Sequence, residues 1–535
     1  MRTTDGNPPA LDRFLQSKTM GRLVLAGSVS ALLLLTGLTI RDGLYFDDTF
    51  MFVRYAQNIL DYGNYGWNAH EHTYGCTNIP FTCFLVLLKW SRMDRAIGLS
   101  ATLLLSSLFW ALLSLGLIHR ILMDLVGPRL DAQRWLPGLY IASLAIAPVF
   151  AYNVTTGMDT SFSLFFNALM IRLVLRFQRH PSMGRLIAAA GCCYFVFLSR
   201  PDCGIYAVLF PVLFFIDKKM SWRQVGSFYL ALGVFLVADT LIKTAYFGNP
   251  LPLPFYVKSS GFYRGYLGKS NWNAVQYSLD FLFDFGFLFI ALLLTAGPRD
   301  LKRFMVFGLP LLLTLGYYFT VTQIMGFHSR YYLPSMPFFV IGAAYAFAGM
   351  PAIKLRPDRL IVPAAWCLFL LLLRFASPAY ELLVQMQSAA EAAAFAMPEN
   401  RANRLGCRDV DYTSGIWAME KLIKLLPDGA TVGATEYGWL SVQAPKLKFF
   451  DLCGLHDREI ALHGYSDRLL SDWQPALIWM PHSDYTSLRK EILAGPWFLA
   501  HYDYYPDAVN YGVAILKSSP QHDLLRDRMI EWNCK

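Results

Sequence analysis

Residues 23–40 read LVLAGSVSALLLLTGLTI, a run without a charged residue. A helix rises about 1.5 Å per residue, so this run nearly matches the roughly 30 Å hydrocarbon core of a bilayer. The chain ahead of it is basic, with Arg2, Arg13, Lys18 and Arg22. Basic residues collect on the cytoplasmic side of membrane spans, so we expect a cytoplasmic N-terminus. No small-residue cleavage site follows, so the run is expected to stay as an anchor.

The composition of the whole chain points the same way. Its 535 residues are 55% hydrophobic and only 16% charged, and the mean hydropathy is +0.36. Such a chain is too apolar for one soluble domain, which predicts a mainly α-helical, polytopic membrane protein. The net charge of +9 could suggest a nucleic-acid partner. The basic residues lie mostly in short loops between apolar runs, however, so we expect them to set membrane topology instead.

Ten further apolar runs resemble membrane spans, which makes about eleven in all. They lie near residues 98–118, 135–151, 160–176, 186–199, 204–216, 225–245, 281–296, 304–322, 332–350 and 359–376. The apolar stretch 79–90 decides the topology, because counting it as a crossing would invert everything after it. It is short for a span. If it does not cross, the basic loops that follow all fall on the cytoplasmic side. We therefore expect an interfacial or re-entrant helix within a first outer loop, residues 41–97.

An odd number of spans, starting from a cytoplasmic N-terminus, places the tail, residues 378–535, on the outer side of the membrane. Residues 1–377 form the membrane domain. The composition of this tail is that of an ordinary globular chain. Short apolar segments predict buried strands at 430–434, 447–452, 476–480 and 512–516, and an amphipathic pattern predicts a helix over 413–426. The sequence thus predicts a small C-terminal α/β domain on the extracytoplasmic side.

Two adjacent acids, Asp47 and Asp48, follow the first span. Ionised groups at a membrane boundary are costly unless they are used, although such charges can also simply mark a helix end. In a helix the two side chains point in different directions, so one could act as a base while the other orients a sugar or a cationic partner. We favour Asp47 as the base. Arg54 and Asn58 lie one helical turn apart and could line the same wall of a pocket.

Further polar residues fall on the same predicted outer side: Asp159, Arg200, Asp202, Lys258, His328 and Arg330. Each has an ordinary structural interpretation, as a helix cap, a local ion pair or an interfacial anchor. Together they suit a lipid-phosphate sugar donor. Its leaving phosphate needs cationic donors, and the acceptor hydroxyl needs a carboxylate to take its proton.

The first outer loop also resembles a known family. It contains Asp47-Asp48, Arg54-Tyr55-Ala56, Asn58, Gly66-Trp67-Asn68 and Tyr74-Gly75-Cys76-Thr77-Asn78. This pattern resembles multi-span glycosyltransferases of the GT-C fold, and is most similar to the arabinofuranosyltransferases that add terminal residues to mycobacterial cell-wall arabinan. The similarity continues through Gly157-Met158-Asp159-Thr160, Arg200-Pro201-Asp202, Gly248-Asn249-Pro250 to Lys258, Arg330-Tyr331-Tyr332-Leu333-Pro334 and residues 451–457.

The resemblance implies an enzyme of the bacterial cytoplasmic membrane. It would move a sugar, arabinofuranose by this resemblance, from a polyprenyl-phosphate donor to a surface glycan or glycoprotein. The catalytic acid would be Asp47 or Asp48. Substrate-binding residues would be Arg54, Tyr55, Asn58, His72, Tyr74, Asp159, Arg200, Asp202, Lys258, His328 and Arg330.

The chain departs from the family pattern at Asn68-Ala69-His70-Glu71-His72, where an acidic or glycine-rich stretch is common, and at Met158 and Asp159, where leucine and glutamate are usual. These changes could retune sugar or acceptor choice. A His-x-His pair alone is a weak metal signal, so we expect no metal and no cofactor. The alternatives are a hexosyltransferase of the same fold, for mannose or glucose, and a transporter or lipid flippase with an outer accessory domain. Transporters usually show repeated halves, and no repeat is evident here.

Overall fold

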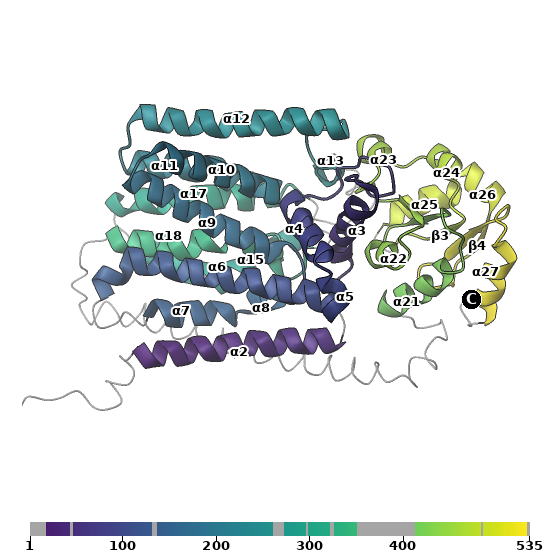
Figure 1. Cartoon of the computed structure of the whole chain (residues 1–535), viewed down its shortest axis with the longest axis horizontal. Coiled ribbons are helices and arrows are strands. Elements are labelled where there is room, and N and C mark those ends of the chain that lie inside the picture. The colour runs from purple at the N-terminus through teal and green to yellow at the C-terminus, as the bar shows by residue number, and fades with distance from the viewer. Residues whose placement is uncertain are drawn as a thin grey trace, which may run out of the picture.

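The computed structural model describes residues 18–42, 46–130, 136–259, 272–295, 298–321, 326–349, 412–482 and 485–531. The span predicted at 359–376 lies outside these ranges. In the N-terminal part, long helices run side by side as a bundle, and the C-terminal domain sits at one end of it (Figure 1). The helices of the bundle are α2 (Lys18–Asp42), α6 (Leu99–Leu130), α7 (Leu136–Ala145), α8 (Pro148–Val154), α9 (Thr160–Arg179), α10 (Met183–Ser199), α11 (Gly204–Asp217), α12 (Trp222–Phe247), α15 (Trp272–Phe281), α16 (Phe287–Thr295), α17 (Pro298–Tyr318) and α18 (Met336–Gly349).

Four described helices are long and apolar enough to cross a membrane: Leu99–Leu130, Thr160–Arg179, Trp222–Phe247 and Ala274–Leu294. The pair α7 and α8, bent by 62°, could form a fifth span. The apolar character predicted from the sequence is therefore present, but the count of eleven spans is not confirmed. Helices α10, α11 and α18 contain 17, 14 and 14 residues, fewer than the about 20 that a straight crossing needs.

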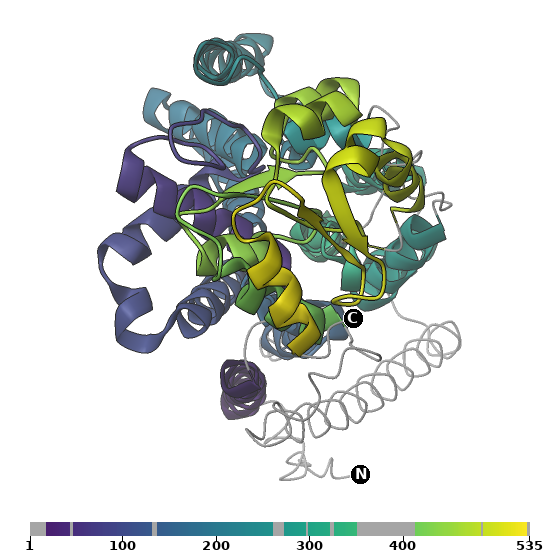
Figure 2. The same ribbon diagram turned by 90° about the vertical axis from the view of Figure 1, so that its right-hand side faces the viewer.

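Helix α12 shows most directly that the bundle suits a bilayer. It lies at the periphery of the bundle when this is viewed end-on (Figure 2), where it packs on α10. Its outer face is apolar and exposed, with Leu230 at 71%, Leu241 at 65% and Ile242 at 68% exposure. In water such a stripe would be unfavourable, whereas lipid tails can cover it.

The first outer loop lies where the bundle meets the C-terminal domain (Figure 1). It contains α3 (Asp47–Tyr62), α4 (Ile79–Trp90) and α5 (Met93–Ile97). Helix α4 covers the apolar stretch that decides the topology. Its 12 residues extend only about 18 Å at about 1.5 Å per residue, too little to cross the hydrocarbon core. On the other side of the bundle end, α13 (Leu253–Ser259) contacts α23 (Arg458–His463) of the C-terminal domain.

The C-terminal domain is built on a five-stranded sheet in the order β2-β1-β3-β5-β4. Strands β1 (Thr431–Ala434), β2 (Lys448–Asp451) and β3 (Leu477–Trp479) are parallel, whereas β5 (Val513–Leu516) runs antiparallel to β3 and to β4 (Tyr502–Tyr505). Four strands coincide with the predicted segments. The prediction missed β4, because its sequence Tyr-Asp-Tyr-Tyr has no aliphatic run.

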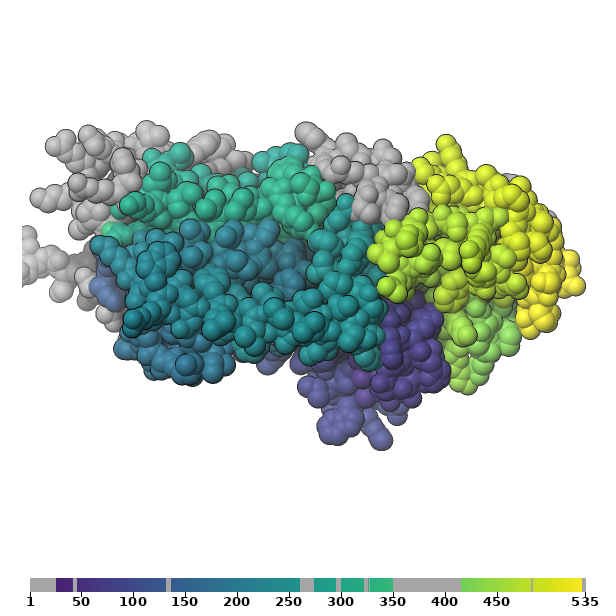
Figure 3. Space-filling view, turned by 90° about the horizontal axis from the view of Figure 1, so that it is seen from above, coloured from purple at the N-terminus to yellow at the C-terminus, as the bar shows by residue number. Residues whose placement is uncertain are grey.

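Helices cover both faces of this sheet. Helices α21 (Tyr412–Ile423) and α27 (His522–Glu531) contribute apolar side chains to one core. Helices α23, α24 (Asp467–Trp473), α25 (Thr486–Ala494) and α26 (Pro496–His501) contribute to the other. The first core also contains Phe50 and Val53 of α3. The C-terminal domain thus shares its core with the first outer loop, and it packs closely against both this loop and the segment near residue 250 (Figure 3).

Candidate active site

Asp47 joins the first outer loop to the C-terminal domain. It lies in the first turn of α3 and is only 3% exposed. Its two carboxylate oxygens accept hydrogen bonds from the backbone N–H groups of Gly438 (2.8 Å) and Trp439 (2.7 Å), at the start of α22 (Gly438–Gln443). Burial raises the pKa of Asp47 to about 6, against the opposing effect of these donors. Asp47 therefore acts in docking the domain.

Gly438 permits this close approach. A Cβ atom at Gly438 would lie 2.1 Å from the backbone oxygen of Asp47. Gly75 has the same role at a second point of contact, where a Cβ would lie 2.0 Å from Nδ1 of His456 and 2.4 Å from the hydroxyl of Tyr55. Only glycine fits at these two positions without moving backbone or ring atoms.

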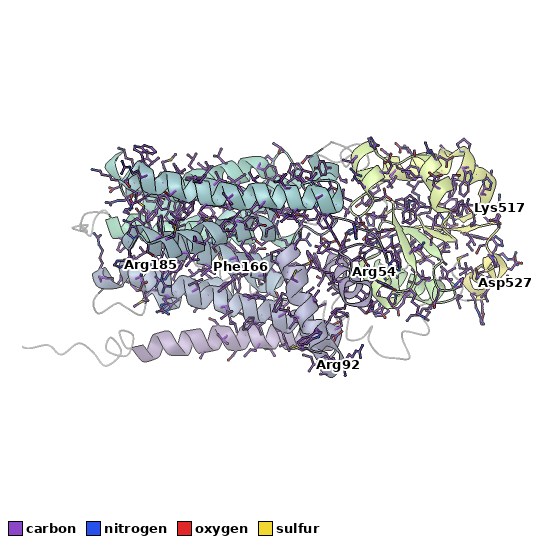
Figure 4. All side chains as sticks on the ribbon, turned by 45° about the horizontal axis from the view of Figure 1, so that its top comes forward. Arg54, Arg92, Phe166, Arg185, Lys517 and Asp527 are labelled. Atoms are coloured by element: carbon purple, nitrogen blue, oxygen red, sulfur yellow. The ribbon has the colours of Figure 1, made fainter. Side chains whose placement is uncertain are left out.

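Arg54 is the second connection between the two parts, and Figure 4 shows it at their boundary. Its guanidinium is 1% exposed and donates to four backbone oxygens, those of Trp67, Ser441, Pro445 and Leu447, at 2.7–3.1 Å. Burial lowers the pKa of Arg54 to about 10, so it stays charged at neutral pH. All of its nitrogens are used by the protein, so it acts as a structural clamp.

Tyr55 and Asn58, also predicted as substrate-binding residues, have structural partners. The hydroxyl of Tyr55 is 2.9 Å from Nδ1 of His456 and accepts from the N–H of Gly75 at 3.1 Å. The Asn58 amide donates to the oxygens of Gly66 and Trp67 at 2.9 Å each. The inner face of α3 is thus committed to holding the loop and the C-terminal domain.

Asp48, in contrast, faces a cavity of about 160 Å³ at the same end of the bundle. Residues from the first outer loop, from the starts and ends of bundle helices and from the C-terminal domain line it together. Six of the predicted site residues are among them: Asp48, Asp159, Arg200, Asp202, Lys258 and Arg330. The sequence analysis did not identify other polar lining residues as site residues: Tyr317, Tyr318, Tyr331 and His456.

Arg330 and Asp48 form the central ion pair of this cavity. Nη2 of Arg330 donates to Oδ2 of Asp48 at 2.9 Å. Arg330 is 4% exposed, and its Nη1 has no hydrogen-bond partner among the described residues. A buried cationic donor without an acceptor is unfavourable. This nitrogen is thus a buried donor, beside the cavity, whose hydrogen-bonding capacity the described residues leave unused.

Tyr331 gathers three cations around its ring. The charged groups of Arg330, Arg200 and Lys258 lie 5.1, 5.3 and 5.4 Å from the ring centroid. Nζ of Lys258 is 3.3 Å from the phenol oxygen, and Nη2 of Arg330 is 3.4 Å from it. Burial raises the pKa of Tyr331, but Lys258 and Arg330 outweigh burial and lower it overall. Asp202 and Asp48 pair with Arg200 and Arg330, so Lys258 is the cation of this cluster without a carboxylate partner among the described residues.

The remaining two acids of the cavity have different surroundings. Asp202 forms a two-point ion pair with Arg200, at 2.8 and 3.2 Å, and also accepts from Tyr318. The local ion pair considered from the sequence is therefore present. Asp159 occupies the position before α9 but makes no capping bond through its side chain. It accepts instead from Nδ2 of Asn78 at 2.9 Å.

Besides Asp47, Arg54, Tyr55 and Asn58, three further predicted residues lie outside this cavity. His328 is exposed and its ring contacts that of Tyr152 in a tilted arrangement, with centroids 3.9 Å apart. Tyr74 is buried against Phe247, at 4.9 Å. His72 stacks on Tyr246 at 4.2 Å and lines a second cavity. The structure therefore does not bring His328, Tyr74 or His72 to Asp48.

No protein-family model matches the chain, and no curated protein sequence is significantly similar to it. Within the described part of the chain, no three or more His, Cys, Asp or Glu side chains are grouped so that they could hold a metal ion. The function must therefore be inferred from the residues of the cavity themselves.

Proposed function

We propose that this protein is an integral membrane glycosyltransferase. It moves a sugar, arabinofuranose in this proposal, from a polyprenyl-phosphate donor to a surface glycan or glycoprotein on the outer face. The observation that carries the proposal is the pairing of Asp48 with Arg330, whose Nη1 is unpartnered, beside Lys258 in one cavity. The carboxylate can take the proton of the acceptor hydroxyl, and the cations can stabilise the negative charge of the leaving phosphate.

In this mechanism Asp48 takes the proton from the attacking acceptor hydroxyl as the new glycosidic bond forms. The bond between the anomeric carbon and the phosphate oxygen breaks, and its electron pair leaves with polyprenyl phosphate. Arg330 and Lys258 stabilise the growing negative charge on that phosphate. Asp48 is 18% exposed, so it can meet a substrate. Asp47 faces backbone donors instead, which favours Asp48 over Asp47 as the base.

The proposed topology has about eleven spans, a cytoplasmic N-terminus and an outer C-terminal domain in the bacterial cytoplasmic membrane. The placement of basic loops supports it. Arg185 belongs to a loop predicted to be cytoplasmic, and it lies at the end of the bundle opposite to the C-terminal domain (Figure 4). The cavity lies at the other end, so it would open on the outer face, where polyprenyl-phosphate sugars are used.

A transfer assay with the purified protein in lipid nanodiscs tests the function. Polyprenyl-phosphate arabinofuranose is supplied with a short arabinofuranosyl oligosaccharide, and the product is measured by mass spectrometry. Arg330→Ala and Lys258→Ala should each lower the rate by at least about tenfold, because each removes a stabilising charge from the leaving phosphate. Arg185→Ala, at the opposite end of the bundle, is the matched control and should leave the rate unchanged.

The donor also distinguishes the alternatives. Transfer from polyprenyl-phosphate mannose or glucose, and not from the arabinose donor, would replace the pentose by a hexose. Movement of the intact lipid donor across the bilayer without any transfer would favour a flippase. If no polyprenyl-phosphate sugar supports transfer by the folded wild-type protein, the glycosyltransferase proposal is wrong.

A further inference from the structure

A second cavity, of about 510 Å³, lies between the first outer loop and the C-terminal domain. Its volume falls within the roughly 300–1,000 Å³ of typical ligand sites. The side chains that matter for its chemistry come from both parts: Asn68, Glu71, His72, Asp457, Glu459 and Trp473. Four of the six lie in two segments that stood out in the sequence: residues 68–72, where the chain departs from the family pattern, and residues 451–457 of the tail.

The loop wall of this cavity is fixed to the sheet. Asn68 is 1% exposed and pairs with Phe449 of β2, accepting from its N–H at 2.8 Å and donating to its carbonyl at 3.2 Å. The same amide donates to both carboxylate oxygens of Glu71, at 3.2 and 3.1 Å. The position of Glu71 is therefore set before any ligand arrives, which reduces the entropy lost on binding.

The chemistry of the lining suits a neutral, hydroxyl-rich ligand. Glu71, Asp457 and Glu459 offer carboxylate oxygens that accept from hydroxyl groups. The half-buried Trp473, which stacks on Phe450 at 5.1 Å, offers apolar ring surface to the face of a sugar. The one lining cation, Arg458, donates to the carbonyl oxygen of Gly248 at 3.2 Å. Four acids, Asp451 included, line the cavity against this one cation, which disfavours a phosphate.

His456 connects this cavity to the first one, because it lines both. The ring is 4% exposed and stacks on Trp67, with centroids 4.2 Å apart and an interplanar angle of 11°. Nδ1 is held by the hydroxyl of Tyr55 at 2.9 Å. One fixed side chain therefore lies between the two cavities. Its Nε2 is 3.4 Å from the sulfur of Met51, which is about one helical turn from Asp48 on α3.

We propose that the second cavity binds the carbohydrate chain of the acceptor, behind the sugar whose hydroxyl reaches Asp48. This proposal rests on the glycosyltransferase function. It assigns the segment Asn68-Ala69-His70-Glu71-His72 to acceptor selection, and it gives the C-terminal domain a direct part in substrate binding.

Binding of a short synthetic arabinofuranosyl oligosaccharide to the full-length protein, measured by calorimetry without donor, tests the proposal. Glu71→Gln, His72→Ala and Glu459→Gln should each weaken binding, by about tenfold where a carboxylate hydrogen bond is lost. In transfer assays these variants should raise the KM for the acceptor more than they lower kcat. Asp527→Asn removes an exposed acid at the far end of the C-terminal domain (Figure 4) and should bind as the wild type does.

Asp48→Asn separates this proposal from the function on which it rests. It should slow transfer by about 10² to 10⁴ and still bind the oligosaccharide. Unchanged affinity in all three cavity variants, or no measurable binding to the wild type, would overturn the acceptor site while transfer by the wild type still supports the enzyme. Failure of the function looks different, because the wild type would then transfer no sugar from any donor.

Discussion

Exchanging each of the adjacent acids for its amide should produce two different defects. Asp47 is buried and bound by two backbone N–H groups of the C-terminal domain, whereas Asp48 faces the cavity and pairs with Arg330. An amide is nearly isosteric with a carboxylate, so Asp47→Asn and Asp48→Asn change charge and hydrogen bonding with little change in volume. We expect the first to lower stability and the second to lower the rate of transfer.

The contacts set the size of each effect. In Asp47→Asn one carboxylate oxygen becomes an NH₂ group facing an N–H donor. A hydrogen bond to a charged group is lost and a buried donor is left unsatisfied, which together cost about 3 kcal/mol. In Asp48→Asn the amide oxygen can still accept from Arg330, but the buried guanidinium loses its charged partner, so some stability is lost as well. Loss of a general base should slow transfer by about 10² to 10⁴.

Thermal unfolding in detergent and transfer from the polyprenyl-phosphate donor should be measured on the same preparations. Asp527→Asn, an exposed acid distant from the cavity, controls for the loss of a negative charge. The reasoning is refuted if Asp48→Asn transfers sugar at nearly the wild-type rate. It is also refuted if Asp47→Asn keeps full stability, because Asp47 then does not hold the C-terminal domain in place.

Three further predictions concern docking, pH and topology. Gly438→Ala should lower the melting temperature and the transfer rate together, because its Cβ would lie 2.1 Å from a carbonyl oxygen of α3; Gly226→Ala, with no atom within 4 Å, should do neither. Burial lowers the pKa of His456 to about 3, so below about pH 6.5 the unfolded chain takes up a proton at this residue and the folded protein does not. The melting temperature of the wild type should therefore fall, relative to that of His456→Gln, as the pH is lowered from 7 to 5. Melting temperatures of the two proteins that change in parallel with pH would contradict this. A reporter active only in the cytoplasm should be active when fused near residue 220 and silent after residue 535, and the reverse result would reject the topology.

The sequence predicted the fold where a segment carries its own signal. Short segments of five or six mostly apolar residues marked β1, β2, β3 and β5, whereas β4 consists of three tyrosines and an aspartate and is placed by pairing with β5. In the bundle the apolar helices were expected, but their ends were not. Several runs that continue as apolar sequence form helices shorter than a span, so hydropathy alone did not give the number of crossings.

The site shows a similar division. Its charged residues, including Lys258 and Arg330, could be found because they gather on the side that the basic loops predict to be the outer one. Which face of α3 meets the cavity could not be found, because that depends on Gly438 and Trp439, nearly four hundred positions further along the chain. This long-range contact decides that Asp47 holds the C-terminal domain and that Asp48 faces the cavity. His456 was missed for the same reason, since nothing near it in the sequence indicates that it would reach the first outer loop.

The two acids also explain why docking and chemistry should be inseparable in this protein. They are consecutive on α3, so any rotation or shift of that helix that disturbs the Asp47 contacts moves Asp48 as well. Arg54 and Asn58 fix the same helix further along, through the carbonyl oxygens of both parts. A displacement of about 1 Å can lower a rate by about 10². The C-terminal domain therefore acts on Asp48 through α3, and variants that loosen docking should slow transfer even when every residue of the cavity is intact.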